Sequence, residues 1–351
     1  MKRRMLCFLC AVVVGAASAS SQEVAWADPS PHTTRLVMVD SGVQLEVLDW
    51  GGSGPTVVLL AGLGATAHYY DDLAPTLAVR NRVIGITRRG HRGSSAATGG
   101  YDFARLAEDV VHVMDAMSIT KAVVIGHSFA GEEMHVLGAR HSARIRGLVY
   151  VDAAFDRGDN VEAQAFAAAA RTAPNAPRPQ SDDLASFTAL RAYLAKYGGA
   201  GPEAHLRARY RTNPDGTVGG PWAPDRAVIQ AMTNAIAAGT HPYNPERISA
   251  PALALYAAPK SADDLIRHGS SDRLPIPELA GKMENDPAVR EQVQQLYLLT
   301  RALVDHHEQW FKRLAPRARV MELSGTHDLM ISSTREVLGQ IEPFIASLPD
   351  A

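Results

Sequence analysis

The feature that most constrains the fold of this chain is an alternation of short apolar runs with segments of helical periodicity. Most of the runs are rich in β-branched residues, and from about Thr56 onward helically spaced segments lie between them. This alternation predicts an α/β domain with a mostly parallel, eight-stranded sheet flanked by helices on both faces. The eight apolar runs are 36–39, 45–50, 57–60, 83–86, 122–125, 148–151, 253–256 and 320–323.

One long interruption divides the predicted core. Residues 153–250 are rich in helical patterns and contain no clear strand, so we predict a helical cap inserted after the sixth strand. The core then comprises residues 35–152 and 251–351. A second long connection, residues 259–316, includes a helix with an apolar stripe, which we interpret as core packing.

The first residues have the pattern of a secretory signal peptide. Three cations at positions 2–4 precede the apolar run 5–16, and small residues follow. We predict removal of residues 1–19, or of residues 1–27 if cleavage occurs at the second small-residue site. The apolar run is shorter than the roughly 20 residues needed to span a bilayer. We therefore expect a secreted or periplasmic protein with no stable membrane anchor.

Composition and charge exclude several classes of function. Both cysteines lie within the predicted signal peptide, so the processed chain has no disulfide and no thiol nucleophile. Removal of residues 1–19 takes away three cations and no acid, which changes the formal net charge from −2 to −5. This mildly acidic balance gives no electrostatic basis for binding nucleic acid or anionic lipid. Because no dinucleotide fingerprint, Walker loop or metal-ligand spacing is present, we expect no cofactor and no metal, while the oligomeric state stays open.

The strongest local motif is V-V-I-G-H-S-F-A-G, which runs from Val123 to Gly131. An apolar strand leads into a tight turn and then a helix, and small residues allow strand and helix to approach closely. The motif resembles the nucleophile elbow of the α/β-hydrolase superfamily, with Ala130 in place of the second glycine of G-x-S-x-G. The resemblance covers residues 35–152 and 251–347. It implies that Ser128 is a nucleophile whose hydroxyl is exposed above the sheet.

A serine nucleophile needs a base that accepts its proton. The last predicted strand is followed by Ser324-Gly325-Thr326-His327-Asp328 and then by an amphipathic helix. A histidine in this loop is similar to the base of the superfamily, and the resemblance therefore implies that His327 is the general base. His306 and His307 lie within a helix, where we expect a solvated or packed role.

Several residues are candidates for the carboxylate that completes the triad. In the commonest arrangement of the superfamily the acid follows the seventh strand within a Gly-x-x-Asp turn, which this chain lacks. The first acids at that point are Asp263 and Asp264. Asp152 closes the sixth strand, a position that some members use, although an aspartate there can also simply cap a turn. We expect Asp152 to be the acid, with Asp263 and then Asp264 as alternatives.

Hydrolysis also needs N–H groups aimed at the oxyanion. One is the backbone N–H of Phe129, which follows the nucleophile. Ala61-Gly62-Leu63-Gly64 resembles the His-Gly-x-Gly stretch of the superfamily, which implies that Leu63 supplies the second and that a bracing histidine is missing. Residues 87–94 resemble its Asp-x-Arg-Gly-His-Gly-x-Ser turn, in which we interpret Arg89 as a structural pin for loops near the site.

Together these residues predict a secreted serine hydrolase that forms an acyl-enzyme. A carboxylic ester with an apolar part is the expected small-molecule substrate, because a cap of this size usually shields an apolar cleft. A serine at the elbow argues against the dehalogenase and epoxide-hydrolase branches, which use aspartate there. The same triad could cleave an amide, a lactone or a carbon–carbon bond, and the fold could also serve as a secreted binding protein without turnover.

Overall fold

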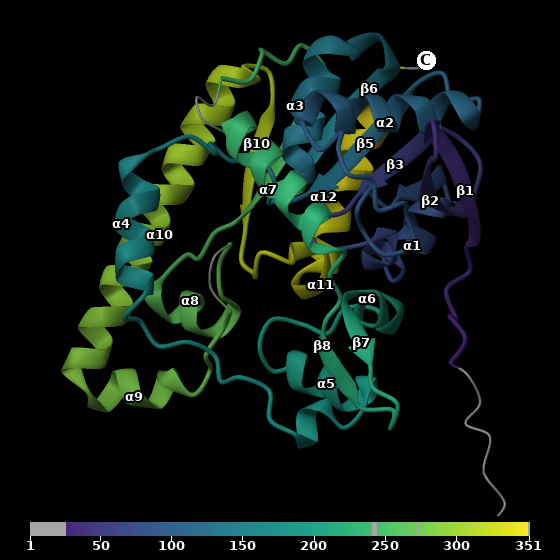
Figure 1. Ribbon diagram of the computed structural model, residues 1–351. Helices are drawn as coiled ribbons and strands as arrows, with labels where there is room; N and C mark the ends of the chain where they lie inside the picture. The colour runs from purple at the N-terminus through teal and green to yellow at the C-terminus, as the bar shows by residue number, and fades with distance from the viewer. Residues whose placement is uncertain (1–25, 241–243, 272–273, 350–351) are drawn as a thin grey trace, which may run out of the picture.

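The computed structural model describes residues 26–240, 244–271 and 274–349, and Figure 1 shows their arrangement. The predicted signal peptide, residues 1–19, lies outside the described residues. Within the described part of the chain, no helix is both long enough and apolar enough to cross a bilayer.

A twisted sheet of eight strands forms the centre of the molecule, in the order β1-β2-β4-β3-β5-β6-β9-β10. β1 and β2 pair antiparallel and β2 is antiparallel to β4, whereas all other neighbours are parallel. Each predicted apolar run falls within one of these strands, so the predicted fold class is confirmed. The strands are β1 (Thr33–Asp40), β2 (Val43–Gly51), β3 (Thr56–Leu60), β4 (Arg82–Ile86), β5 (Ala122–His127), β6 (Ile145–Val151), β9 (Ala252–Ala257) and β10 (Arg319–Leu323).

Helices cover both faces because successive side chains of a strand point to opposite sides. In β5, Val124 packs in one hydrophobic cluster, whereas Val123 and Ile125 pack in another on the opposite face. The first cluster is closed by α2 (Phe103–Ala116), α3 (Ala130–Arg140) and the end of α10 (Pro287–Leu314). The second is closed by η1 (Ala67–Tyr70), α1 (Ala74–Ala78), α11 (Leu329–Ser332) and α12 (Thr334–Ser347).

The excursion between β6 and β9 contains helices, as predicted, but the expectation that it has no strand is wrong. β7 (Tyr210–Thr212) and β8 (Val218–Pro221) form an antiparallel hairpin. Its turn, Asn213-Pro214-Asp215-Gly216, is a strong turn sequence, and Gly216 has the positive φ of 85° that glycine tolerates. Glycines in β8 weaken the period-two pattern that would have indicated the strand. The helices are α4 (Val161–Ala170), η3 (Asp182–Leu184), α5 (Phe187–Leu194), α6 (Glu203–Arg209) and α7 (Arg226–Thr240).

A second excursion, between β9 and β10, contributes α8 (Ala262–His268), α9 (Leu279–Asn285) and the long α10. Figure 1 shows α10 and α4 running side by side along one flank of the molecule. Leu296 and Leu303 of α10 pack with Phe166 of α4 in one cluster. The two excursions therefore join into one structure that lies over the carboxyl ends of the central strands.

Candidate active site

Ser128 lies in the sharp turn between β5 and α3. Its φ is +56°, a strained value for a residue other than glycine. Two glycines make the turn possible, because a Cβ on Gly126 would overlap Met134 and a Cβ on Gly131 would overlap the carbonyl oxygen of Ala153. The turn thus needs glycine at 126 and 131, whereas position 130 accepts alanine.

His327 extends from the loop between β10 and α11 toward this serine. Its Nε2 atom lies 2.8 Å from Ser128 Oγ. The backbone of His327 is held on both sides, because its N–H donates to Ser270 O at 3.1 Å and its carbonyl lies 2.9 Å from Nε2 of His127. The structure thus brings together the nucleophile and base predicted from the sequence.

Asp152 is fully buried directly after β6 and lies on the other side of the imidazole. Its Oδ2 atom is 2.6 Å from His327 Nδ1. Its Oδ1 atom accepts hydrogen bonds from the Ala257 N–H and the Ser271 hydroxyl, both at 2.9 Å. Asp152 therefore has a partner for each carboxylate oxygen, and it holds His327 with Nδ1 protonated and with Nε2 directed at the serine hydroxyl, whose proton it can accept.

The alternative acids are located elsewhere. Asp263 lies in the exposed first turn of α8, where its carboxylate binds Arg267 at 2.6 Å. Asp264 accepts hydrogen bonds from the Lys260 N–H and the Ser324 hydroxyl. Neither residue forms a hydrogen bond with His327 in the described part of the chain. Ser261 caps α8 and directs both acids into its first turn.

The two predicted oxyanion donors lie beside the nucleophile. The Phe129 N–H precedes α3, and a Cβ built on Gly62 would lie 3.1 Å from Ser128 Cβ, which places the loop carrying Leu63 against the serine. Neither the Phe129 nor the Leu63 amide has an acceptor among the described residues. Both N–H groups are thus available to a ligand at this point.

The residue that holds the Leu63 loop is Arg88, which the sequence analysis left unassigned. Arg88 Nη2 lies 2.9 Å from the carbonyl oxygen of Ala61, its Nη1 lies 3.5 Å from that of Gly62, and its Nε binds Glu133 of α3. Arg89, the predicted structural pin, forms a buried pair with Asp109 of α2 and donates to the carbonyl oxygen of Gly99 at 3.1 Å. Arg88 and Arg89 thus point in different directions, Arg88 to the Leu63 loop and Arg89 to α2.

His91 provides the brace that the alanine at position 61 cannot. Its Nε2 accepts the Gly64 N–H at 3.0 Å, and its Nδ1 lies 3.1 Å from the carbonyl oxygen of Arg89, so the ring is neutral with the proton on Nδ1. Burial, followed by the nearby Arg88 charge, lowers the pKa of His91 to about 4. The expectation that this loop lacks a histidine brace is therefore wrong.

His127, next to the nucleophile, is a further histidine that the sequence reasoning left unassigned. Its ring stacks on Tyr69 with centroids 4.9 Å apart. Burial and the neighbouring His327 lower its pKa to about 3. It is therefore a neutral packing residue that supports the His327 loop. Its position directly before Ser128 was the one sequence signal that it lies near the site.

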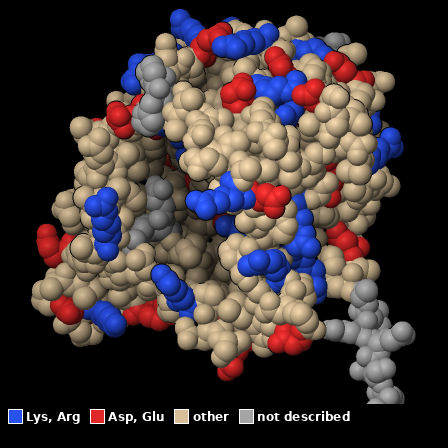
Figure 2. Space-filling model, viewed as in Figure 1, with Lys and Arg blue, Asp and Glu red and all other residues tan. Residues whose placement is uncertain are grey.

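A cavity of about 620 Å³ opens at Ser128 and His327. Its apolar walls include Phe155, Phe166 of α4 and Leu303 of α10. Figure 2 shows this side of the molecule hollowed between the core and the lobe of α5, α6, β7 and β8, with Lys and Arg side chains beside the hollow.

His307 of α10 also lines this cavity, a position that its helical context did not indicate. Its Nδ1 accepts the Asp156 N–H at 3.2 Å, and burial lowers its pKa to about 4. A neutral imidazole with its proton on Nε2 therefore forms part of the wall.

Comparisons with known proteins agree with this fold. Residues 55–192 match the family model described as alpha/beta hydrolase fold. An inferred carbamate hydrolase of Caulobacter segnis, RutD, is 37% identical over 114 residues, which are 32% of this chain and 43% of that protein. The fluoroacetate dehalogenase of a Burkholderia species is 30% identical over 107 residues, 29% of this chain and 35% of that protein. The chain thus matches less than half the length of these curated relatives.

Solved structures share the fold over nearly the whole chain. E-2-(acetamidomethylene)succinate hydrolase aligns with a TM-score of 0.61 and 18% identity, covering 90% of this chain and all of that one. The Rhodococcus esterase RhEst1 aligns with a TM-score of 0.53 and 18% identity, covering 90% and 99%. At such identities the likeness shows the fold alone. The chain therefore has the α/β-hydrolase fold, and residues 55–192 match the family model of that fold.

Proposed function

We propose that the protein is a serine hydrolase that cleaves carboxylic esters through an acyl-enzyme. The observation that carries the proposal is the continuous contact from Asp152 through His327 to Ser128, with distances of 2.6 and 2.8 Å. This arrangement lies at a cavity and beside two backbone N–H groups that have no acceptor among the residues the structure describes. A nucleophile, an oriented base and oxyanion donors are the parts that acyl transfer requires.

The geometry supports a two-step reaction. Ser128 Oγ attacks the ester carbonyl carbon while its proton passes to Nε2 of His327, and the buried Asp152 carboxylate stabilises the resulting imidazolium. The carbonyl oxygen becomes an oxyanion that accepts hydrogen bonds from the Phe129 and Leu63 amides. The C–O bond to the alcohol then breaks, and the alcohol takes the proton from His327. Water attacks the acyl-enzyme by the same route and releases the acid and the free serine.

The cavity wall favours a substrate with an apolar part. Phe155, Phe166 and Leu303 present apolar surface beside the nucleophile, and burial of each CH₂ group of a ligand contributes about 0.8 kcal/mol. Amides, lactones and ketone-activated carbon–carbon bonds fit the same triad. A panel of alkyl esters, lactones and anilides of matched chain length, assayed on the purified protein, distinguishes these bonds.

Labelling with a fluorophosphonate tests the proposal most directly. The cavity holds two serines, Ser128 and Ser271, so peptide mapping must locate the label. We expect stoichiometric labelling of Ser128, and we expect Ser128→Ala to lose the label and to hydrolyse a short p-nitrophenyl ester at least about a thousandfold more slowly. A folded protein that is not labelled would support binding without turnover, whereas a folded Ser128→Ala variant of unchanged rate would remove Ser128 from the mechanism.

We also propose that the protein acts outside the cytoplasm after removal of residues 1–19 or 1–27. The support is the cationic, apolar and small-residue pattern of the first segment. N-terminal sequencing of protein recovered from medium or periplasm should begin at residue 20 or 28. Retention of the intact chain in the cytoplasm would contradict export.

A further inference from the structure

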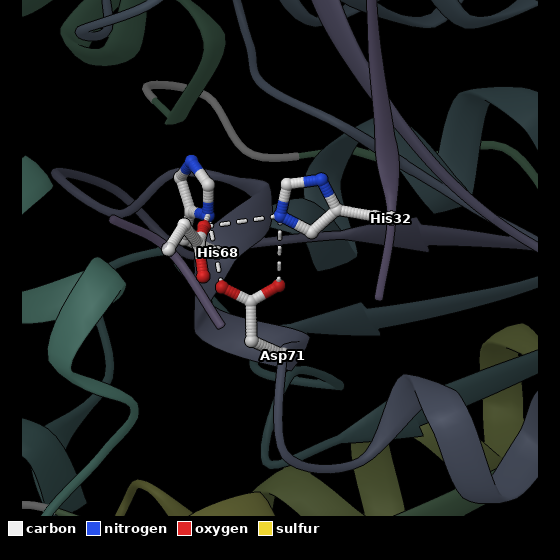
Figure 3. A group of neighbouring side chains, drawn as sticks. His32, His68 and Asp71 are labelled. Carbon is white, nitrogen blue, oxygen red and sulfur yellow. Dashed lines mark hydrogen bonds and ion pairs between the residues drawn. The ribbon is translucent and has the colours of Figure 1, made fainter. Parts of the chain in front are cut away.

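Two histidines and two aspartates converge on one point at the start of the sheet, away from the catalytic residues. Asp28 and His32 precede β1, whereas His68 belongs to η1 and Asp71 directly follows it. Figure 3 shows His32, His68 and Asp71 pointing toward one another. Sequence spacing led us to expect no metal site, and this cluster departs from that expectation because two segments some forty residues apart supply it.

The nitrogen-to-oxygen distances within the cluster lie near the ligand-to-ligand distance of a tetrahedral metal site. His32 Nε2 lies 3.1 Å from an oxygen of Asp28 and 3.6 Å from one of Asp71. His68 Nδ1 lies 3.2 Å from the same oxygen of Asp28 and 2.8 Å from the other oxygen of Asp71. Bonds of about 2.0 Å to a tetrahedral zinc ion imply ligand-to-ligand distances of about 3.3 Å. The ligand atoms are thus spaced to surround one ion.

Hydrogen bonding among the four residues leaves contacts that one proton per nitrogen cannot satisfy. Each of the two ring nitrogens faces oxygens of both carboxylates, yet an imidazole nitrogen carries at most one hydrogen. A cation at the centre contacts both nitrogens and both carboxylates at once. The side chains of His32 and Asp71 are only 6% and 4% exposed, so water has little access to compensate.

Neighbouring groups hold the ligands in this orientation. The Ser30 N–H donates to Asp28 Oδ1 and the Ser30 hydroxyl to Asp71 Oδ1, both at 2.9 Å. The Trp50 Nε1–H donates to the same hydroxyl at 3.2 Å, and the Trp50 ring meets the His32 ring edge-on, with centroids 5.5 Å apart. Such outer contacts orient the ligands of protein metal sites.

We propose that Asp28, His32, His68 and Asp71 bind one zinc ion in a structural site. Two imidazoles favour zinc over calcium or magnesium, and four protein ligands leave no open position for catalysis. The ion links the segment before β1 to η1, whose Tyr69 packs against His127 beside the nucleophile. The proposal does not depend on the hydrolase chemistry, because its tests measure metal and not turnover.

Metal analysis of the full chain, purified without a polyhistidine tag, tests this site. After exposure to zinc and removal of free metal, we expect one zinc per chain in the wild type, a melting temperature that rises with zinc, and a reversal by EDTA. His32→Ala and Asp71→Asn should abolish both the bound zinc and the rise in melting temperature. His268→Ala is the matched control, because His268 forms an exposed pair with a single carboxylate, Asp264, and should leave both effects intact.

Two further measurements keep the proposal testable if a buried-ligand variant fails to fold. His68→Gln and Asp28→Asn alter the less buried half of the cluster and should weaken zinc binding at least about a hundredfold. Cobalt substitution should give the intense visible absorption of tetrahedral Co²⁺ in the wild type only. Zinc binding that is equal in wild type and ligand variants, no bound zinc, or an octahedral cobalt spectrum would each overturn the site.

Discussion

Asp152 and His327 meet across a strand that lies between their own. Asp152 follows β6 and His327 follows β10, and β9 separates these strands in the sheet. The Ala257 N–H at the end of β9 donates to one oxygen of Asp152, whose other oxygen lies 2.6 Å from His327 Nδ1. In this protein the acid follows β6, and β9 supplies only the backbone N–H that holds it.

Replacement of the acid separates the two carboxylates considered from the sequence. Asp152→Asn should lower kcat about ten-thousandfold, because an amide in this position favours the imidazole tautomer that cannot accept the serine proton. Asp263→Asn should change kcat less than about twofold, because Asp263 is exposed on α8. Initial rates on one ester, with circular dichroism as the folding control, measure both. Equal losses in the two variants would contradict the role given to Asp152.

Arg88 should affect kcat through the Leu63 loop, which supplies one of the oxyanion donors. The Gly62 carbonyl and the Leu63 N–H belong to one trans peptide and point in opposite directions, so a guanidinium on the carbonyl side directs the N–H away from itself. Loss of one oxyanion donor costs about a hundredfold or more in kcat. Arg88→Gln should therefore lower kcat about a hundredfold and leave KM nearly unchanged.

The control for Arg88 must separate this effect from stability. Arg88→Gln leaves Glu133 buried without its cation, which costs about 3–5 kcal/mol of folding free energy. The double variant Arg88→Gln/Glu133→Gln removes both charges and should regain stability but not kcat. Arg92→Gln changes an exposed arginine of the same turn and should retain both stability and kcat. Recovery of kcat together with stability in the double variant would limit Arg88 to a structural role.

The buried histidines predict loss of stability in acid. The pKa of His91 and that of His307 are lowered to about 4, and the pKa of His127 and that of His205 to about 3, mainly by burial. Above pH 6.5 neither the folded nor the unfolded chain protonates them. Below pH 6.5 the unfolded chain binds protons that the folded chain does not, so each histidine lowers the free energy of unfolding by up to about 1.4 kcal/mol per pH unit.

Urea unfolding at pH 7, 6 and 5 measures this dependence. The wild type should lose stability steadily below pH 6.5. His91→Gln should be less stable at pH 7, because Gly64 loses its acceptor, and should show a shallower decline with falling pH. A wild-type free energy that is constant from pH 7 to pH 5 would refute the inference.

The cavity wall allows a test of substrate size. Ala167 of α4 lines the cavity, whereas Ala165 lies on the opposite side of the helix. Ala167→Phe should lower kcat/KM for a long-chain ester about tenfold or more and spare an acetate ester, because it fills space that only the longer acyl group uses. Ala165→Phe should leave both rates unchanged. The ratio of the two rates in each variant is the measurement, and an unaltered ratio in Ala167→Phe would place the acyl group elsewhere.

The sheet could be predicted from the sequence because each strand is marked by residues that are neighbours in the chain. Buried parallel strands read as short apolar runs, and the turn around Ser128 needs small residues that are visible in the chain. Ser128 and His327 therefore carried local signals. The choice between Asp152 and Asp263 had no such signal, since it depends on the order in which β6, β9 and β10 pair.

The other features that the sequence did not reveal have the same physical origin. Arg88 and Arg89 are adjacent and chemically identical, and only the direction of each side chain decides which one reaches the loop. His91 braces Gly64 from a different turn of the chain. For the cluster of Asp28, His32, His68 and Asp71, the i,i+4 and i,i+3 spacing within each pair was a weak signal. Its two halves are brought together only by tertiary structure.

The joint origin of the cavity wall has an evolutionary consequence. α4 and α10 come from two separate excursions, so insertions or substitutions in either one can reshape the chamber while the strands that hold Ser128, Asp152 and His327 keep their sequence. Selection for a new substrate thus has two independent routes in this architecture, and neither requires the reaction machinery to be rebuilt.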